Sequence, residues 1–371
     1  MRIEQLKLRN FRNYRELTLR PHPGVNLFYG RNGSGKTNLL EAIHYCSLGR
    51  SHRITNDINA VKNGESFALS SVLIRNGLGR REIAVRFHPD ETQKKEILID
   101  KKRISRFSDM MGCLRCVIFS PEDLGLIKEG PSMRRRYLDM MISQINRGYF
   151  IALQQYKAAM DQRNTVIRNL RANTGNLSVL SAFEETMSVP AAVIIRERRK
   201  IISLLSDIAA DTYRRVSDTD ESFRISYHSS LKEETEMEET LCRLYQKSRE
   251  DDIRMGFTSV GPHRDDLALT LNKNNMKQFA SQGQIRTAAL SMKLSQMQIL
   301  RNMSGDEPVL LLDDVMSELD RKRRICLIRE ISSFQTFITC ADRDDVDREK
   351  VNQSWNVFAE NGEADVDPIR K

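Results

Sequence analysis

The sequence predicts an α/β fold in which a mixed-sheet lobe carries an inserted helical lobe with a short arm. Three observations lead to this prediction. A glycine-rich loop at residues 30–37 lies between a short apolar strand and a helix. The apolar residues 309–312 lead into two carboxylates, as in a buried parallel strand. Between these motifs, residues 121–250 are helical in pattern. We expect residues 1–120 and 251–371 to form the first lobe, residues 121–250 to form the second, and residues 281–284 to lie at their junction.

The glycine-rich loop fits the pattern G-x-x-x-x-G-K-[ST]. Its glycines allow positive φ and let backbone N–H groups surround a phosphate. Lys36 can reach the β and γ phosphates of ATP, and the Thr37 hydroxyl can coordinate Mg²⁺. The following helix directs its positive N-terminal end at the phosphates. The residues expected to contact the nucleotide are Gly30, Arg31, Asn32, Gly33, Ser34, Gly35, Lys36, Thr37 and Asn38.

Two acids follow the apolar strand at residues 309–312. Asp313 is expected at the C-terminal edge of a parallel sheet, where α/β proteins bind ligands, and there it can hold Mg²⁺ through a water molecule. Asp314 can act in catalysis by orienting or deprotonating the attacking water. A helix cap after the strand is an alternative interpretation of Asp314.

The tetrad Ser281-Gln282-Gly283-Gln284 precedes a long helical segment. A small polar residue and a glycine before a helix predict an anion-binding helix N-terminus. A plain helix cap explains the same residues.

The N-terminal residues 1–29 alternate between apolar and polar, which predicts an antiparallel hairpin. Residues 66–119 contain several further short strands. In the turn of the first hairpin, Phe11 or Arg12 can reach an adenine by stacking or a cation–π contact. Ordinary core and surface roles explain these two residues equally well.

The composition is that of a soluble globular protein, with 40% hydrophobic and 29% charged residues among 371. No apolar run approaches the ~18 residues that a membrane span needs, and the first residues lack the apolar stretch of a signal peptide. Cys113 and Cys116 form a CxxC pair, but no second pair completes a zinc site. We therefore expect a cytoplasmic protein with reduced cysteines and no membrane partner.

The formal net charge of +9 favours a polyanionic partner such as DNA. The charge is uneven, because residues 128–171 hold nine Lys and Arg against three acids. The candidates for contacts with DNA phosphates are Arg134, Arg135 and Arg136, and in a second cluster Lys101, Lys102 and Arg103. In the alternative interpretation, the first cluster is a solvated helix start and the second is a charged hairpin tip.

The order of these motifs resembles the ABC-type ATPase head of SMC and Rad50-like proteins. Within that group the chain closely resembles the RecF family. Gly-Pro-His-Arg-Asp-Asp at 261–266 and Ser-Gln-Gly-Gln at 281–284 are typical of RecF proteins rather than of transporters. The resemblance extends nearly from end to end, through residues 8–14, 30–37, 120–124, 261–267, 281–284 and 311–320.

The resemblance implies an ATP-dependent homodimer. Ser281, Gln282, Gly283 and Gln284 would bind the γ phosphate of ATP held by a second subunit, and Asp320 would lie in a loop that meets that subunit. RecF-like proteins bind gapped DNA at junctions of single and double strands. With RecR and RecO they promote RecA loading in DNA repair and replication restart. A weak, DNA-stimulated ATPase activity is the implied chemistry.

Some positions differ from the ABC-type pattern. Asp314 replaces the usual glutamate, and Thr339 or Cys340 lies where a switch histidine is expected. No Q-loop glutamine can be assigned, and Glu122 or Asp123 is nearest to its place. These differences indicate slow hydrolysis. His263 and Arg264 have no assigned role beyond a structural turn.

The sequence bears on three alternative functions. A transporter ATPase subunit predicts a Leu-Ser-Gly-Gly-Gln-like signature, which the sequence lacks. A long SMC-type tether is excluded, because the chain shows no sustained heptad pattern. A scaffold that senses ATP without hydrolysing it remains open.

Overall fold

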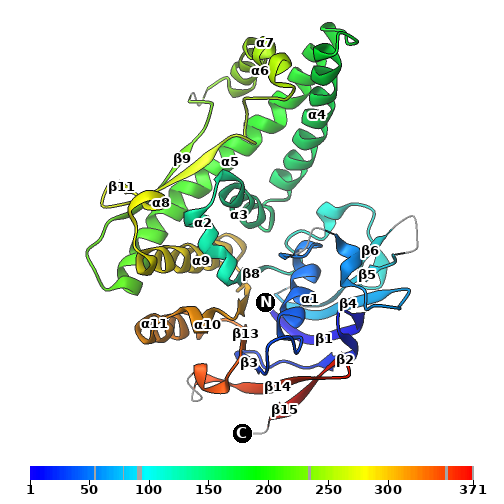
Figure 1. The fold of residues 1–371 in the computed structure, drawn as a ribbon, viewed down its shortest axis with the longest axis vertical. Coiled ribbons are helices and arrows are strands. Elements are labelled where there is room, and N and C mark those ends of the chain that lie inside the picture. The colour runs from blue at the N-terminus through cyan, green and yellow to red at the C-terminus, as the bar shows by residue number, and fades with distance from the viewer. Residues whose placement is uncertain (54–55, 78, 90–93, 233–234, 347–349, 370–371) are drawn as a thin grey trace. The chain divides into compact units, whose positions relative to one another are not determined.

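The computed structural model describes residues 1–53, 56–77, 79–89, 94–232, 235–346 and 350–369. The chain forms two compact units (Figure 1). The first comprises residues 1–124, 211–220 and 282–371, and the second comprises residues 125–210 and 221–281. The sequence placed residues 251–281 with the mixed-sheet lobe, whereas the structure groups them with the helices. The reason is a small separate sheet, whose strands in this range pair with a strand of the helical unit.

An antiparallel sheet occupies the N-terminal part of the first unit. Its apolar residues alternate, so one face of the sheet is buried against helix α1 (Lys36–Leu48). The predicted N-terminal hairpin is present, with Leu8 opposite Leu17. Within the described residues the strand order is β2-β1-β4-β5-β6-β7. Their bounds are β1 Arg2–Phe11, β2 Tyr14–Leu19, β4 Ala68–Asn76, β5 Gly79–Phe87, β6 Lys95–Ile99 and β7 Lys102–Arg103.

A mostly parallel sheet forms the rest of the core of this unit. Phe28 stacks between Phe337 and Trp355, at centroid distances of 6.1 and 6.0 Å, and so joins three neighbouring strands. The parallel register places Asp313 opposite Thr339, and Cys340 opposite Tyr29. The carboxyl ends of these strands therefore meet at one edge. The described order is β15-β14-β3-β13-β12-β8, with β3 Val25–Tyr29, β8 Cys116–Phe119, β12 Val309–Asp313, β13 Thr336–Cys340, β14 Gln353–Glu360 and β15 Glu363–Ile369.

Helices follow the strands of the parallel sheet. α9 (Gln282–Ser304) is the long helix predicted after the Ser-Gln-Gly-Gln tetrad. The short α10 (Val315–Glu318) and α11 (Arg321–Ile331) connect β12 to β13. The 3₁₀ turns of this unit are η1 Asp57–Ala60, η2 Phe107–Asp109, η3 Pro121–Leu124 and η4 Arg343–Asp345.

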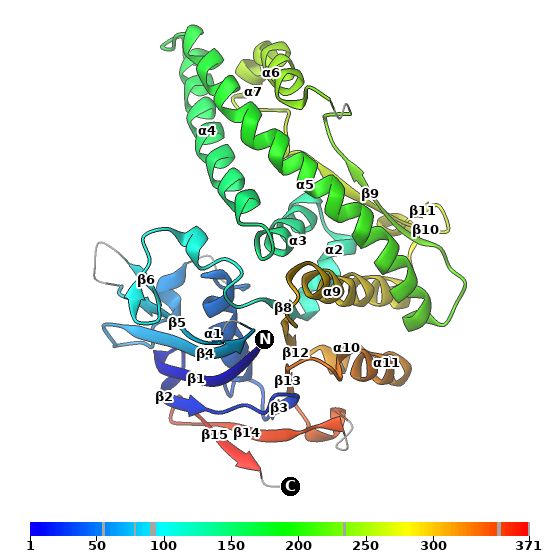
Figure 2. The same ribbon diagram turned by 180° about the vertical axis from the view of Figure 1, so that it is seen from behind.

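Two long helices, α4 (Arg147–Arg171) and α5 (Ser178–Ser217), lie side by side (Figure 2). The second unit contains α4 and residues 178–210 of α5. α5 is the one helix of the described ranges that is long and apolar enough to cross a membrane, although half of its apolar window is buried, as in a core helix. The prediction that no apolar run approaches the length of a membrane span does not hold for this helix. The other elements are α2 Gly125–Lys128, α3 Pro131–Ser143, α6 Met237–Lys247, α7 Arg249–Met255, α8 Met276–Phe279, β9 Phe223–His228, β10 Asp266–Leu271 and β11 Asn274–Asn275.

The turn at residues 261–266 connects several elements of the helical unit, whereas the sequence indicated only a structural turn there. Gly261 has a φ of 118°, and a Cβ there would lie 2.5 Å from Tyr156 Oη. His263 donates from Nε2 to the Thr258 carbonyl at 3.0 Å, so its Nδ1 accepts from Tyr156 Oη at 2.6 Å. Asp265 accepts hydrogen bonds from the Tyr227 hydroxyl and the Ser230 N–H. The motif thus joins α4, β9 and the start of β10.

Burial lowers the pKa of His263 from 6.5 to about 4, although the hydrogen bond to Thr258 opposes this shift. Arg264 and Arg135 also lower this pKa, whereas Asp252 raises it. The folded protein therefore keeps a neutral imidazole at a pH where the unfolded chain takes up a proton. The stability that depends on this neutral form is complete above about pH 6.5 and is lost as the pH falls toward about 4.

We predict that the wild type loses about 2 kcal/mol more unfolding free energy than His263→Gln between about pH 7.5 and about pH 5. Glutamine cannot titrate, so it removes this contribution even where it lowers stability at every pH. Urea unfolding at the two pH values measures the difference. Parallel pH dependence in the two proteins would contradict the assignment.

Candidate nucleotide-binding site

The glycine-rich loop connects β3 to α1 in a conformation that requires glycine. Gly30 and Gly35 have φ values of 153° and 114°. A Cβ on Gly30 would lie 2.0 Å from the Val357 carbonyl oxygen, and a Cβ on Gly35 would lie 2.9 Å from Tyr14 Oη. Gly33 has a φ of 81° but open space around it. The backbone is thus held close to its neighbours at both ends of the loop.

The turn of the N-terminal hairpin supports this loop. Tyr14 Oη donates to the Gly35 carbonyl at 3.2 Å, and Asn13 Nδ2 donates to the Ser34 carbonyl at 3.3 Å. Asn38, which was predicted to contact the nucleotide, donates from Nδ2 to Asn13 Oδ1 at 2.8 Å. Asn38 therefore holds the hairpin turn against the first turn of α1.

Lys36 is buried, and its ammonium group closes the loop. Nζ donates to the carbonyl oxygens of Gly30 at 2.6 Å and Arg31 at 2.9 Å. Burial lowers the pKa of Lys36, against the opposing charge of Asp314.

Two features of the loop make it suitable for binding a phosphate group. The Ser34 hydroxyl is buried and has no hydrogen-bond partner among the described residues. Helix α1 begins after Gly35 without a side-chain cap, so its first N–H groups point at the loop with no helical acceptor.

The two predicted metal ligands are in contact. Asp313 Oδ1 accepts one hydrogen bond from Thr37 Oγ1 and another from Thr339 Oγ1, both at 2.8 Å. The Thr37 oxygen donates its proton here and keeps its lone pairs for a cation. Mg²⁺ commonly takes one or two carboxylates together with phosphate oxygens and water, so this arrangement fits the ion. Burial raises the pKa of Asp313, and the hydrogen bonds from the two threonines oppose that shift.

Asp314 adopts a left-handed backbone conformation, with a φ of 53°. Its N–H donates to the Thr339 carbonyl at 3.2 Å and to Thr339 Oγ1 at 3.0 Å. The Ser317 hydroxyl donates to the Asp314 carbonyl at 2.8 Å. Although Asp314 precedes α10, its side chain caps none of that helix's N–H groups. The helix-cap interpretation is therefore wrong, and the carboxylate is left at the edge beside Asp313.

The structure separates the two Q-loop candidates. Asp123 is held locally, since Ser120 N–H donates to its Oδ2 at 2.9 Å and Lys293 Nζ lies 2.7 Å from its Oδ1. Glu122 is exposed, and its charge raises the pKa of Asp313. Of the two candidates, Glu122 is the acid whose charge acts on Asp313.

Arg53 was not identified from the sequence. It follows α1 in an exposed loop, and its charge lowers the pKa of Asp313. No spacing rule marks this arginine, because it reaches the site only through the path of the loop after α1. The opposing charges of Arg53 and Glu122 both act on the same carboxylate.

The tetrad at residues 281–284 lies at the start of α9, as predicted. Ser281 and Gln282 are exposed, and Gly283 and Gln284 are half-buried. Arg323 of α11 fixes this end of the helix by donating to the Gly283 carbonyl at 3.2 Å and to Thr287 Oγ1 at 2.8 Å.

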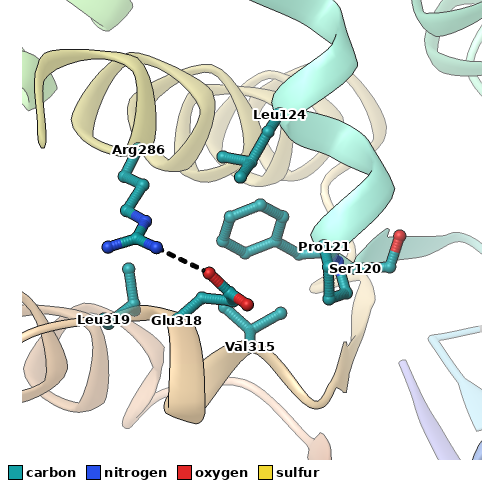
Figure 3. A pocket seen from close by; sticks show the side chains of 8 residues that line it. Ser120, Pro121, Leu124, Arg286, Val315, Glu318 and Leu319 are labelled. Carbon is teal, nitrogen blue, oxygen red and sulfur yellow. Dashed lines mark hydrogen bonds and ion pairs between the residues drawn. The ribbon is translucent and has the colours of Figure 1, made fainter. Parts of the chain in front are cut away.

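Helix α9 is also linked to the elements beside the two acids. Arg286 Nη2 lies 2.8 Å from Glu318 Oε2 of α10, and both side chains line a small pocket together with Leu124, Val315 and Leu319 (Figure 3). Further along α9, Lys293 donates to the Ile118 carbonyl at 2.8 Å and pairs with Asp123. The helix that carries the tetrad thus contacts η3 and α10, which flank Asp313 and Asp314.

The suggested adenine contacts are not supported. Phe11 is fully buried and packs on Tyr45 and Phe87 at centroid distances of 6.0 and 6.1 Å, so adenine stacking on Phe11 is wrong. Arg12 makes a double ion pair with Glu41, at 2.9 Å from each carboxylate oxygen. Its third nitrogen donates to the Asn59 carbonyl. The core role for Phe11 and a structural role for Arg12 explain these contacts.

The first cluster of proposed DNA contacts needs a correction. Arg134 is buried, and it binds Asp266 through Nε and Nη2 at 2.7 and 2.9 Å. Its Nη1 donates to the Leu126 and Glu129 carbonyls. Arg135 donates to the Asp265 carbonyl at 2.8 Å. The anionic partner of Arg134 is therefore Asp266 of the chain itself, and Arg134 is not available to DNA.

The second basic cluster is exposed. Lys101 lies in the turn between β6 and β7, Lys102 and Arg103 form β7, and Arg103 is 3.6 Å from Glu96. Arg136 is also exposed.

A family model described as "RecF/RecN/SMC N terminal domain" matches residues 2–364. "DNA replication and repair protein RecF" of Clostridium novyi is 37% identical over 358 residues, covering 96% of this chain and 98% of the relative. The protein of the same name from Ruminiclostridium cellulolyticum is 38% identical over 93% of this chain and 94% of its own. The chain belongs to the RecF family.

The comparison of structures agrees with this family. A solved structure described as "recombination mediator protein RecF-ATPrS in RecFOR pathway" has a TM-score of 0.91 and 34% identity, covering 100% of this chain and 98% of that one. An SMC head bound to the C-winged helix domain of ScpA has a TM-score of 0.59 at 16% identity, covering 100% and 98% of the two chains, which shows the fold alone. The predicted ABC-type head with mixed α/β sheets is thereby confirmed.

We predict that alanine lowers the unfolding free energy by different amounts at two glycines of the glycine-rich loop. Gly35→Ala should lower the unfolding free energy by about 3 kcal/mol, because it combines a positive φ with close contacts to Tyr14 and Asn13. Gly33→Ala is the matched control and should cost about 1 kcal/mol, since it meets only the backbone penalty. Urea unfolding without nucleotide measures both values, and equal losses would contradict the tight packing of the loop.

Proposed function

We propose that the protein is an ATP-dependent, DNA-binding recombination mediator of the RecF type. The observation that carries the proposal is the meeting of Thr37, Asp313 and Thr339 beside the glycine-rich loop. This arrangement fits a magnesium–nucleotide site, and it lies in a chain whose relatives are named DNA replication and repair proteins. Solved relatives described with ATP and with ATPrS support ATP as the nucleotide.

In this proposal, different residues of the site bind the phosphates, hold Mg²⁺ and act on the attacking water. Lys36 and the loop N–H groups hold the phosphates, with the Lys36 ammonium exchanging its carbonyl partners for phosphate oxygens. Thr37 and Asp313 hold Mg²⁺, which neutralises charge on the phosphates. Asp314 orients or deprotonates the attacking water. The shorter acid at this position is in keeping with a weak, DNA-stimulated ATPase.

A second copy of the chain completes the site in this proposal. The tetrad Ser281–Gln284 of one subunit binds the γ phosphate held by the other, and the exposed start of α9 is suited to this role. Asp320 caps α11, because its Oδ1 accepts from the Arg323 N–H at 3.0 Å, and this contact holds the loop that meets the second copy.

The dimer acts in the cytoplasm on gapped DNA at junctions of single and double strands. It works with RecR and RecO to promote RecA loading during repair and replication restart. Membership of the RecF family removes the reason to consider a transporter subunit. A scaffold that binds ATP without hydrolysing it differs from this proposal in one measurable property, the release of phosphate in the presence of DNA.

We predict that Ser281→Arg blocks ATP-dependent dimerisation and leaves ATP binding by the monomer within about threefold, because the added bulk falls at the second subunit's site. Lys36→Ala should lose both ATP binding and ATP-dependent dimerisation, because the main positive charge that balances the phosphates is removed. Light scattering and nucleotide titration measure the two properties. A mixture of the two variants should recover one composite site and some dimer. Loss of ATP affinity in Ser281→Arg monomers would show that the tetrad acts within its own subunit.

We predict that replacing Lys101, Lys102 and Arg103 by alanine weakens binding to gapped DNA and lowers the log–log salt slope by about two to three units, because each phosphate contact releases about one counterion. ATP should tighten DNA binding by the wild type, since dimerisation outweighs the added negative charge. Arg254→Ala is the control, because Arg254 is already paired with Asp251 at 2.6 Å. Unchanged affinity and slope in the triple variant would move the DNA surface elsewhere.

A further inference from the structure

Asp314 is held in a backbone conformation that an aspartate does not prefer. A left-handed φ costs a residue other than glycine about 1–2 kcal/mol, and such residues persist only where neighbours fix them. Here the fixing groups are the carbonyl and the hydroxyl of Thr339, both of which accept from the Asp314 N–H. The Ser317 hydroxyl donates to the Asp314 carbonyl at 2.8 Å and lies 3.4 Å from Asp314 Oδ1. The backbone conformation that sets the direction of the Asp314 side chain is therefore fixed by Thr339 and Ser317 together.

The same hydroxyl also contacts Asp313. A threonine hydroxyl has one proton to donate and two lone pairs. The proton is directed to Asp313 Oδ1 at 2.8 Å, whereas the Leu312 carbonyl is further away at 3.4 Å. A lone pair accepts from the Asp314 N–H at 3.0 Å. One buried oxygen atom thus links both acids.

We propose that Thr339 is the positioning residue of this site. This inference rests on the proposed function. Thr339 holds the Asp313 carboxylate in the rotation that Mg²⁺ requires and holds the Asp314 peptide in the conformation that directs its carboxylate at the water. The parallel register makes this possible, because it places Thr339 directly opposite Asp313.

Strand β13 offers a matched control for a purely structural role. Thr336 is also fully buried, and its Oγ1 donates to the Phe334 carbonyl at 3.2 Å, with no hydrogen bond to an acid among the described residues. Thr336→Val and Thr339→Val each replace one hydroxyl of the same strand by a methyl group of similar size. A general effect on the packing of β13 would appear in both variants.

The test measures nucleotide binding as a function of Mg²⁺, ATP-dependent dimerisation and single-turnover phosphate release. In Thr339→Val we expect ATP binding without Mg²⁺ to be unchanged. The Mg²⁺ concentration that gives half of its maximal effect on nucleotide binding should rise about tenfold, and the hydrolysis rate should fall about 10–100-fold. Thr339→Ser keeps the hydroxyl and should remain within about threefold of the wild type. Thr336→Val should match the wild type in all three measurements. Thr339→Ala provides the same test with less bulk where the valine variant does not fold.

Two results would overturn the proposal. In the first, the variants without the Thr339 hydroxyl keep the wild-type Mg²⁺ dependence and rate. In the second, Thr336→Val loses as much as Thr339→Val, which would assign the effect to strand packing. A wild type that binds no nucleotide would instead overturn the proposed function, and with it the basis of this inference.

Discussion

The site depends on one buried carboxylate oxygen, Asp313 Oδ1, which two threonine hydroxyls hold from different parts of the chain. Thr37 belongs to the helix after the glycine-rich loop, and Thr339 belongs to β13. Their meeting requires that β3, β13 and β12 be parallel neighbours whose carboxyl ends share an edge. The stacked rings of Phe28, Phe337 and Trp355 help to fix that sheet. The core packing is thus also what places the chemical groups.

The sequence predicted the centre of the site because its signals are local. The loop pattern identifies Lys36 and Thr37 directly, and an apolar run that ends in an acid identifies Asp313. Glu122 was only one of two candidates, and Arg53 was missed, since both act on Asp313 from loops whose paths no periodicity predicts. The domain boundary at residue 251 was misplaced for a similar reason. β10 pairs with β9, and helical pattern alone gives no sign of that pairing.

The basic block at residues 128–171 shows why clustered charge is weak evidence for DNA binding. Arg134 pairs with Asp266, and the fully buried Arg163 pairs with Asp252 and Glu184 at 2.7 and 3.0 Å. These partners are distant in the sequence, so the block looks unbalanced only along the chain. Removing one member of such a buried pair typically costs about 3–5 kcal/mol, because the other charge is left buried and unpaired. Part of the positive charge therefore serves the fold of the helical unit.

The contacts of α9 also differ in strength according to their burial. Lys293 of this helix is buried and is held by both the Ile118 carbonyl and Asp123, whereas the Arg286–Glu318 pair is partly exposed and contributes less. A displacement of α9 that broke the Lys293–Asp123 pair would separate two opposite charges that are largely removed from solvent. The turn η3, whose Glu122 charge acts on Asp313, is therefore coupled to the position of the helix. Through these contacts, the position of the tetrad at the start of α9 is linked to the electrostatic surroundings of the metal ligand.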